Sequence, residues 1–136
     1  MPMKLLIWDF DGTLGERKGA WSGALVEVLE REGIAAQREC LRPFIQSGFP
    51  WHAPEIVRPP REAPDLWWER LEPVFARAYE KGADLRSDEA RRLAGKVRDV
   101  YVAPKHWELF DDSVDVVAAL SDRGWGTFCS PTMFPS

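Results

Sequence analysis

The hydrophobic positions of the chain change their spacing several times, and each spacing predicts an element. Residues 4–9 (KLLIWD) form a short, almost continuous apolar run that ends in Asp-Phe-Asp-Gly. Such a run predicts a strand that is buried on both faces and enters a loop, as strands of parallel sheets do. Residues 125–129 predict a second strand, because they directly follow a helical stretch that ends at Gly124.

Helical spacing dominates the chain between these two strands. The predicted helices cover residues 22–32, 65–82, 87–103 and 112–123. Pro73 lacks the N–H of a helical hydrogen bond, so we expect it to kink the second of these helices or to split it. On the last helix, Val116, Val117 and Leu120 should face inward. Six of the eleven prolines fall within residues 43–64, where regular structure should be short or absent.

This order of elements predicts an α/β fold in which a helical block interrupts the sheet. We expect a parallel-sheet core made of residues 1–16 and 105–136, with residues 17–104 inserted between its strands as an α-helical cap. Ligands of open α/β sheets bind beyond the carboxyl ends of the strands. The sequence therefore predicts a ligand site at residues 9–14.

The composition argues against several classes of protein. The 136 residues include 22 acids and 18 bases in mixed order, for a net charge of −4, which disfavours a nucleic-acid partner. No apolar run approaches the roughly 20 residues of a membrane span, and the first residues do not resemble a signal peptide. Cys40 and Cys129 have no metal-ligand spacing, so we expect reduced thiols in a soluble, cytoplasmic protein.

Asp9 and Asp11 carry the clearest chemistry in the sequence. They lie two residues apart just beyond the first strand, so an extended backbone would point both carboxylates to the same side. Two close carboxylates repel and favour a divalent cation or a shared proton, and Mg²⁺ prefers such hard oxygen ligands. Gly12 allows a tight turn close to an anion, and Thr13 offers a phosphate its hydroxyl and amide groups.

The segment Asp9–Leu14 (DFDGTL), directly behind a predicted strand, resembles the first motif of the haloacid-dehalogenase superfamily of hydrolases. Residues 109–125 (LFDDSVDVVAALSDRGW) are similar to the helix that leads into the second core strand of that family. The resemblance implies a Rossmann-like core, incomplete in this chain, with a helical cap inserted after the first motif.

The same resemblance implies a role for each matched acid. Asp9 would attack phosphorus and form an aspartyl-phosphate, while Asp11 would protonate the leaving oxygen and later deprotonate the hydrolytic water. The Asp9 carboxylate and the Asp11 main-chain carbonyl would bind Mg²⁺. An acid at position 11 favours phosphoryl transfer over dehalogenation. The implied protein is a magnesium-dependent phosphatase that acts on a small phosphorylated metabolite.

The family's later motifs are expected to be missing. They comprise a strand that ends in Ser or Thr, a Lys or Arg, and further acidic residues, whereas only seven residues follow Cys129. The Ser130-Pro131-Thr132 tripeptide is a poor substitute, since its proline disrupts the strand end. With freely chosen wobble bases, a one-base shift of frame after the Trp125 codon encodes an apolar strand that ends in Ser-Asn. We therefore expect a truncated or frameshifted hydrolase with little or no activity and poor solubility.

Several alternatives stay open. The chain is an inactive fragment or pseudoenzyme of this family, an unrelated acidic helical interaction module, or a protein whose DxDG forms a calcium-type or turn-forming loop by chance. Trp51 and His52, in the proline-rich stretch, either contact substrate from the cap or belong to a packed surface loop. The charged residues 16–18 either steer a phosphate or form a solvated loop.

Overall fold

The structure, a computed structural model, describes residues 2–56 and 63–129 of the chain. It is mixed α/β, as the hydrophobic pattern predicts. The chain divides into two compact units: unit 1 contains residues 1–18 and 104–136, and unit 2 contains residues 19–103. The Ser130-Pro131-Thr132 tripeptide and the rest of the tail lie outside the described residues.

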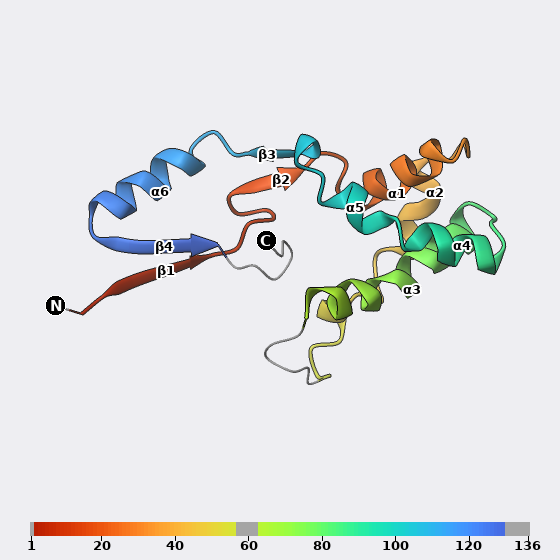
Figure 1. The fold of residues 1–136 in the computed structure, drawn as a ribbon, viewed down its shortest axis with the longest axis horizontal. Coiled ribbons are helices and arrows are strands. Elements are labelled where there is room, and N and C mark those ends of the chain that lie inside the picture. The colour runs from red at the N-terminus through yellow and green to blue at the C-terminus, as the bar shows by residue number, and fades with distance from the viewer. Residues whose placement is uncertain (1, 57–62, 130–136) are drawn as a thin grey trace. The chain divides into compact units, whose positions relative to one another are not determined.

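The first sheet of unit 1 contains the two strands that the sequence predicts. Strand β1 (Lys4–Trp8) pairs in parallel with β4 (Trp125–Cys129), with Lys4 opposite Trp125 and Trp8 opposite Cys129. Helix α6 (Ser113–Asp122) precedes β4 and packs along it (Figure 1). It ends at Asp122, and Gly124, two residues later, has a φ of 85° that suits glycine.

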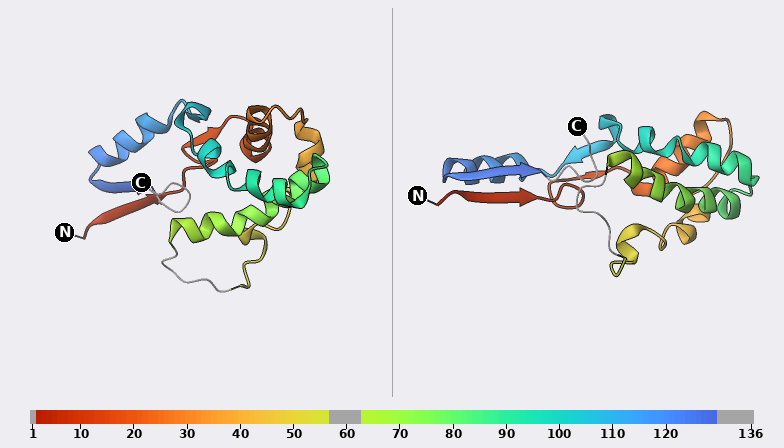
Figure 2. Two further views of the ribbon diagram at one scale, coloured as in Figure 1. Left: turned by 45° about the vertical axis from the view of Figure 1, so that its right-hand side comes forward. Right: turned by 60° about the horizontal axis from the view of Figure 1, so that its bottom comes forward.

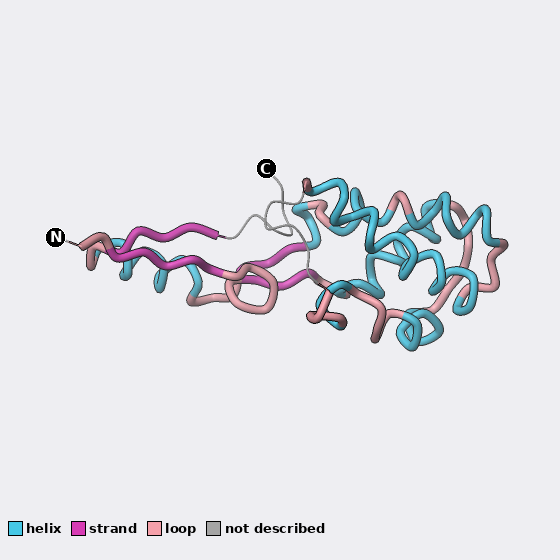
Figure 3. Tube along the Cα trace, turned by 90° about the horizontal axis from the view of Figure 1, so that it is seen from below, coloured by secondary structure: helices cyan, strands magenta, loops and turns pink. Residues whose placement is uncertain are grey.

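Unit 1 also contains a second sheet that the sequence does not predict. Strand β2 (Gly15–Arg17) pairs antiparallel with β3 (Trp107–Leu109), which follows the 3-10 turn η3 (Pro104–His106). Both sheets are drawn in magenta in Figure 3. The second sheet joins the segment behind Asp9 to the segment before α6, about ninety residues later in the chain.

The prediction that β1 is buried on both faces is wrong. Leu5 is 48% exposed and Ile7 is 62% exposed, and they share one face of the sheet with Phe128, which is 48% exposed. Residues on the opposite face, such as Leu6 and Trp8, are half-buried. Within the described residues β1 has β4 as its one strand neighbour, and nothing covers the face that carries Leu5 and Ile7.

The inward face predicted for the last helix is only partly present. Val117 and Leu120 are half-buried, but Val116 is 40% exposed. The buried residue of α6 is Ser113, in its first turn. The difference has a physical reason: β4 and β1 form a narrow sheet, so α6 covers a smaller apolar area than a wider sheet would offer.

Unit 2 is helical, and Figure 2 shows its helices from two further directions. Its elements are α1 (Ala20–Arg31), α2 (Arg38–Leu41), η1 (Arg42–Phe44), η2 (Pro50–His52), α3 (Pro64–Gly82), α4 (Ser87–Ala94) and α5 (Val97–Tyr101). All nineteen buried hydrophobic residues of the described chain belong to this unit. The hydrophobic core therefore lies in the helical unit, whereas the described part of unit 1 has no buried hydrophobic residue.

Two predictions about the helices of unit 2 are corrected by the structure. Helix α3 continues through Pro73, so the alternative of a split helix is wrong. Pro73 has no N–H to donate to the main-chain carbonyl four residues earlier, but Pro73 is exposed, so this carbonyl can face solvent. The predicted helix over residues 87–103 is broken into α4 and α5 at Gly95 and Lys96. Glycine in the interior of a helix weakens the helix, which favours a break at Gly95.

Aromatic side chains make several of the contacts between the helices of unit 2. Trp21 of α1 stacks on Tyr101 of α5, with 3.6 Å between ring centroids and an interplanar angle of 8°. The hydroxyl of Tyr79 on α3 donates a hydrogen bond of 2.9 Å to the main-chain oxygen of Leu25 on α1. Burial raises the pKa of the Tyr79 phenol, because the charged form loses its hydration. These contacts join three helices that are far apart in sequence.

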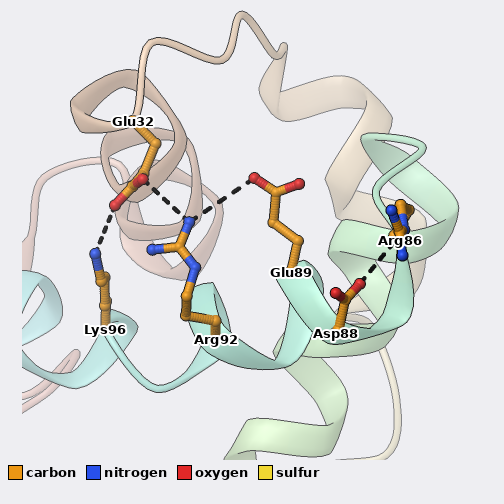
Figure 4. Close-up of polar contacts among 6 residues, drawn as sticks. All are labelled: Glu32, Arg86, Asp88, Glu89, Arg92 and Lys96. Atoms are coloured by element: carbon orange, nitrogen blue, oxygen red, sulfur yellow. Dashed lines mark hydrogen bonds and ion pairs between the residues drawn. The ribbon is translucent and has the colours of Figure 1, made fainter.

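An ion-pair network on the surface of unit 2 joins the end of α1 to α4 and α5 (Figure 4). One carboxylate oxygen of Glu32 lies 2.5 Å from Nζ of Lys96, and the other lies 3.2 Å from Arg92. Arg92 also lies 3.8 Å from Glu89. The hydrogen bonds from Lys96 and Arg92 lower the pKa of the Glu32 carboxyl, since they stabilise its charged form.

Candidate functional site

The loop that follows β1 contains Asp9, Asp11, Gly12 and Thr13, all four predicted residues of the phosphate and metal site. The carboxylate of Asp9 is exposed and Asp11 is half-buried. The hydroxyl of Thr13 lies 3.4 Å from Oδ2 of Asp9 and donates to it. The structure thus brings Asp9 and Thr13 together at the carboxyl end of a parallel strand, where ligands of α/β sheets bind.

The loop is held by its own main-chain hydrogen bonds. The carbonyl oxygen of Phe10 accepts from the N–H groups of Thr13, Leu14 and Gly15 at 3.1, 3.0 and 3.2 Å. Gly12 has a φ of 81°, and its N–H donates to the oxygen of Gly15 at 2.8 Å. The turn therefore needs a left-handed residue at position 12, as the sequence predicts.

These bonds change how the loop can hold an anion. The sequence predicts that the Thr13 amide is offered to a phosphate, whereas in the structure the amides of Gly12 and Thr13 both donate within the loop. The Thr13 hydroxyl, which is exposed and only 3.4 Å from Asp9, can rotate toward a ligand instead. Apart from the residues next to Gly12 in the chain, no atom of the described residues lies within 4 Å of the space where a Cβ of Gly12 would stand, so an anion can approach the main chain there.

Residues just before α6 and in its first turn hold the end of the loop at Leu14. The hydroxyl of Ser113 donates to the oxygen of Leu14 at 2.6 Å, and the N–H of Phe110 donates to the same oxygen at 2.9 Å. Ser113 was not among the residues predicted for this site. Its position at the start of a predicted helix was the available signal, because serine there often bonds to main-chain groups.

The charged residues 16–18 do not form a solvated loop throughout. Glu16 and Arg17 belong to β2, and Arg17 is only 5% exposed. The Arg17 guanidinium donates to the oxygen of Lys18 at 3.0 Å, and the Lys18 N–H donates to the oxygen of His106 at 2.7 Å. Arg17 therefore serves the structure of the second sheet, and the described position of its side chain does not suit steering of a phosphate in solvent.

The chemistry of the loop's donor set fits Mg²⁺. A magnesium ion in a protein is typically held by one or two carboxylates, with water and substrate phosphate completing its shell. Asp9 supplies an exposed carboxylate, and Asp11 supplies a main-chain carbonyl and a second carboxylate nearby. Over residues 2–56 and 63–129, no group of three or more His, Cys, Asp or Glu side chains is arranged to hold a metal by itself. The carboxylate of Asp9 and the oxygens of Asp11 are the ligands that the loop could offer such an ion.

Trp51 and His52 lie in unit 2, in the short helix η2. Both side chains are exposed, and Trp51 stacks on Phe49 with 4.4 Å between ring centroids. The main-chain N–H of Phe49 donates to Nδ1 of His52 at 3.2 Å. His52 lines a cavity of about 760 Å³, whereas Trp51 is not part of its described lining.

The chain matches no protein-family model, and a search of curated proteins finds no match. The resemblance to the haloacid-dehalogenase superfamily therefore depends on residues 9–14 and 109–125 of the sequence. No helix in the described parts of the chain is both long and apolar enough to cross a bilayer.

Proposed function

We propose that Asp9 and Asp11 are the nucleophile and the acid–base residue of a magnesium-dependent phosphatase of the haloacid-dehalogenase type. The proposed substrate is a small phosphorylated metabolite, and the net charge of −4 does not favour a nucleic acid in its place. One observation carries the proposal: an exposed Asp9, within reach of the Thr13 hydroxyl, lies directly at the carboxyl end of a parallel strand.

Each residue of the loop has a defined part in this reaction. An oxygen of Asp9 attacks phosphorus and forms an aspartyl-phosphate while the leaving oxygen departs. Asp11 gives that oxygen its proton and then takes a proton from the water that hydrolyses the intermediate. The Thr13 hydroxyl donates to a phosphoryl oxygen, and the open space at Gly12 lets the phosphate approach the main chain.

Bound Mg²⁺ would neutralise negative charge between the carboxylates and the phosphate. The residues that would hold it are Asp9, through its carboxylate, and Asp11, through its main-chain carbonyl. We also propose that the protein acts in the cytoplasm, where a free and exposed thiol such as that of Cys40 stays reduced.

The test is release of nitrophenol from p-nitrophenyl phosphate with and without MgCl₂. We expect weak turnover that requires Mg²⁺, because the described part of unit 1 has no hydrophobic core to hold the loop firmly. Asp9→Asn should abolish turnover, and Asp11→Asn should lower it by about 10²-fold or more. Asp122→Asn, which removes an exposed carboxylate of α6, is the control and should leave turnover unchanged.

A second candidate is supported by the lack of a buried hydrophobic residue in the described part of unit 1. If its exposed sheet face keeps the loop from forming a working site, the chain is an inactive fragment or pseudoenzyme of the family. Absence of turnover in a folded wild-type chain would favour this candidate over the phosphatase. Turnover that persists in Asp9→Asn would count against both, since a nucleophile other than Asp9 would then be at work.

A further inference from the structure

The two acids of the loop are held in place by different parts of unit 1. Asp9 directly follows β1, whose last residue, Trp8, pairs with Cys129 of β4. Asp11 lies two residues farther along the chain, where its main chain pairs with Gly15 in an isolated parallel bridge. The position of Asp9 therefore follows from the first sheet, whereas the position of Asp11 depends on the turn that Gly15 closes.

This turn is anchored through the main chain of Leu14. The oxygen of Leu14 accepts from the hydroxyl of Ser113 at 2.6 Å and from the N–H of Phe110 at 2.9 Å. The N–H of Leu14 donates to the oxygen of Phe10 at 3.0 Å, and that oxygen belongs to the peptide bond between Phe10 and Asp11. Leu14 thus links the main chain beside Asp11 to the start of α6.

The burial of Ser113 strengthens this link. Ser113 is 6% exposed and is the buried residue of α6, and a hydrogen bond is stronger where water is excluded. A serine hydroxyl has one proton to donate, and here the proton goes to Leu14 and not to a main-chain oxygen of α6 itself. The Ser113 hydroxyl therefore serves the loop and not its own helix.

We propose that Ser113 is a positioning residue for Asp11. Its hydroxyl holds the turn in the form that lets Asp11 protonate the leaving oxygen, so the inference rests on the proposed function. In that step an oxygen of Asp9 bonds to phosphorus, the bond from phosphorus to the leaving oxygen breaks, and the leaving oxygen takes the Asp11 proton. A displaced acid slows this proton transfer, while the nucleophile keeps the place that β1 gives it.

The choice of leaving group reports how well Asp11 is placed. Phenyl phosphate releases phenolate, a strong base that needs the proton, whereas p-nitrophenyl phosphate releases a much weaker base that needs it little. The measured quantity is kcat/KM, which covers the steps up to departure of the leaving group and not the later hydrolysis. Ser113→Ala should lower kcat/KM about tenfold for phenyl phosphate and less than about twofold for p-nitrophenyl phosphate.

Two further variants frame this measurement. Asp11→Asn removes the acid itself and should show the same contrast between the substrates in a larger form. Ser121→Ala removes an exposed hydroxyl from the same helix and should leave both values of kcat/KM unchanged. Ser113→Ala should keep its fold, because the oxygen of Leu14 retains the bond from Phe110, and circular dichroism checks this.

The outcomes separate the inference from the function on which it rests. Equal losses with the two substrates in Ser113→Ala would show a purely structural role and overturn the inference, and so would unchanged values with both. The proposed function fails by a different result, the absence of turnover of either substrate by the wild-type chain, and the inference fails with it.

Discussion

Gly15 is the residue on which the shape of the Asp9 loop depends most directly. A Cβ atom at this position would lie 2.6 Å from the main-chain oxygen of Glu108 and 3.2 Å from the ring of Phe10. The first of these neighbours belongs to the backbone of β3 and cannot move without opening the second sheet. Glycine is therefore required where the loop behind Asp9 meets β3.

Gly15→Ala should loosen this contact. We expect it to destabilise unit 1 by about 1–3 kcal/mol, the usual cost of forcing a methyl group into a packed position. Amide hydrogen exchange at Phe110, whose N–H is bonded to Leu14, is the measurement. Gly95→Ala is the control, because its Cβ would meet no atom closer than 3.6 Å. Unchanged exchange at Phe110 in Gly15→Ala would contradict this account of the loop.

At the scale of elements, local patterns predict the two strands β1 and β4 and the three longest helices, α1, α3 and α6. Residues 125–129 form β4 as predicted. Helix α1 ends at Arg31, and just past this end the N–H of Ile34 donates to the oxygen of Leu29, as a C-terminal cap requires. The pairing of β2 with β3 could not be read in the same way. Each strand has three residues, too few for a periodic signal, and the pairing depends on a contact across about ninety residues.

Glu32 makes the junction of α1 with α4 and α5 sensitive to pH. The pKa of its carboxyl is lowered in the folded chain, so the ion pairs stabilise the fold above the unfolded pKa of about 4.5. That contribution is lost as the pH falls through the lower, folded pKa. Glu32→Gln should therefore lower the melting temperature at pH 7, and the difference from wild type should vanish in strong acid.

Thermal melts followed by circular dichroism at a series of pH values check this prediction. The control is Glu30→Gln, which changes an exposed residue of α1 two positions before Glu32 and outside the network, and it should melt like the wild-type chain at every pH. A Glu32→Gln deficit that stays constant from pH 7 into strong acid would show that the ion pairs do not cause it.

At the scale of the whole molecule, hydrophobic burial is divided unequally between the two units. The nineteen buried hydrophobic residues all lie within residues 19–103, whereas β1 and β4 expose Leu5, Ile7 and Phe128. Parallel strands are usually covered on both faces, which is why the apolar run at residues 4–9 predicts burial. The run identifies the strand correctly, but burial depends on what packs against it, which a local pattern does not contain.

This division predicts two levels of stability within one chain. Amides of α1 and α3 should exchange at least about tenfold more slowly than amides of β1 and α6, because burial of apolar area opposes local opening. Hydrogen exchange followed by mass spectrometry distinguishes these segments. Equal protection of all four elements would contradict the unequal division of the core.

The candidate site was predictable from the sequence as far as its residues are adjacent in the chain. Asp9, Asp11, Gly12 and Thr13 lie in one loop behind β1, as the spacing predicts. Engagement of the Gly12 and Thr13 amides within that loop was not predictable, because it depends on the fold of the turn rather than on residue type. The hydrogen bond from Ser113 to the oxygen of Leu14 was not predictable either, because it joins residues that are 99 positions apart in the chain.

The central claim is that Asp9 is the nucleophile, and trapping the phosphorylated chain tests it most directly. The chain is mixed with p-nitrophenyl phosphate and Mg²⁺, quenched with acid and analysed by mass spectrometry. We predict one phosphoryl group on the peptide that contains Asp9, more of it in Asp11→Asn, where hydrolysis of the intermediate is slowed, and none in Asp9→Asn. A phosphoryl group on Asp11, or none on Asp9 in either the wild-type or the Asp11→Asn chain, would contradict the account.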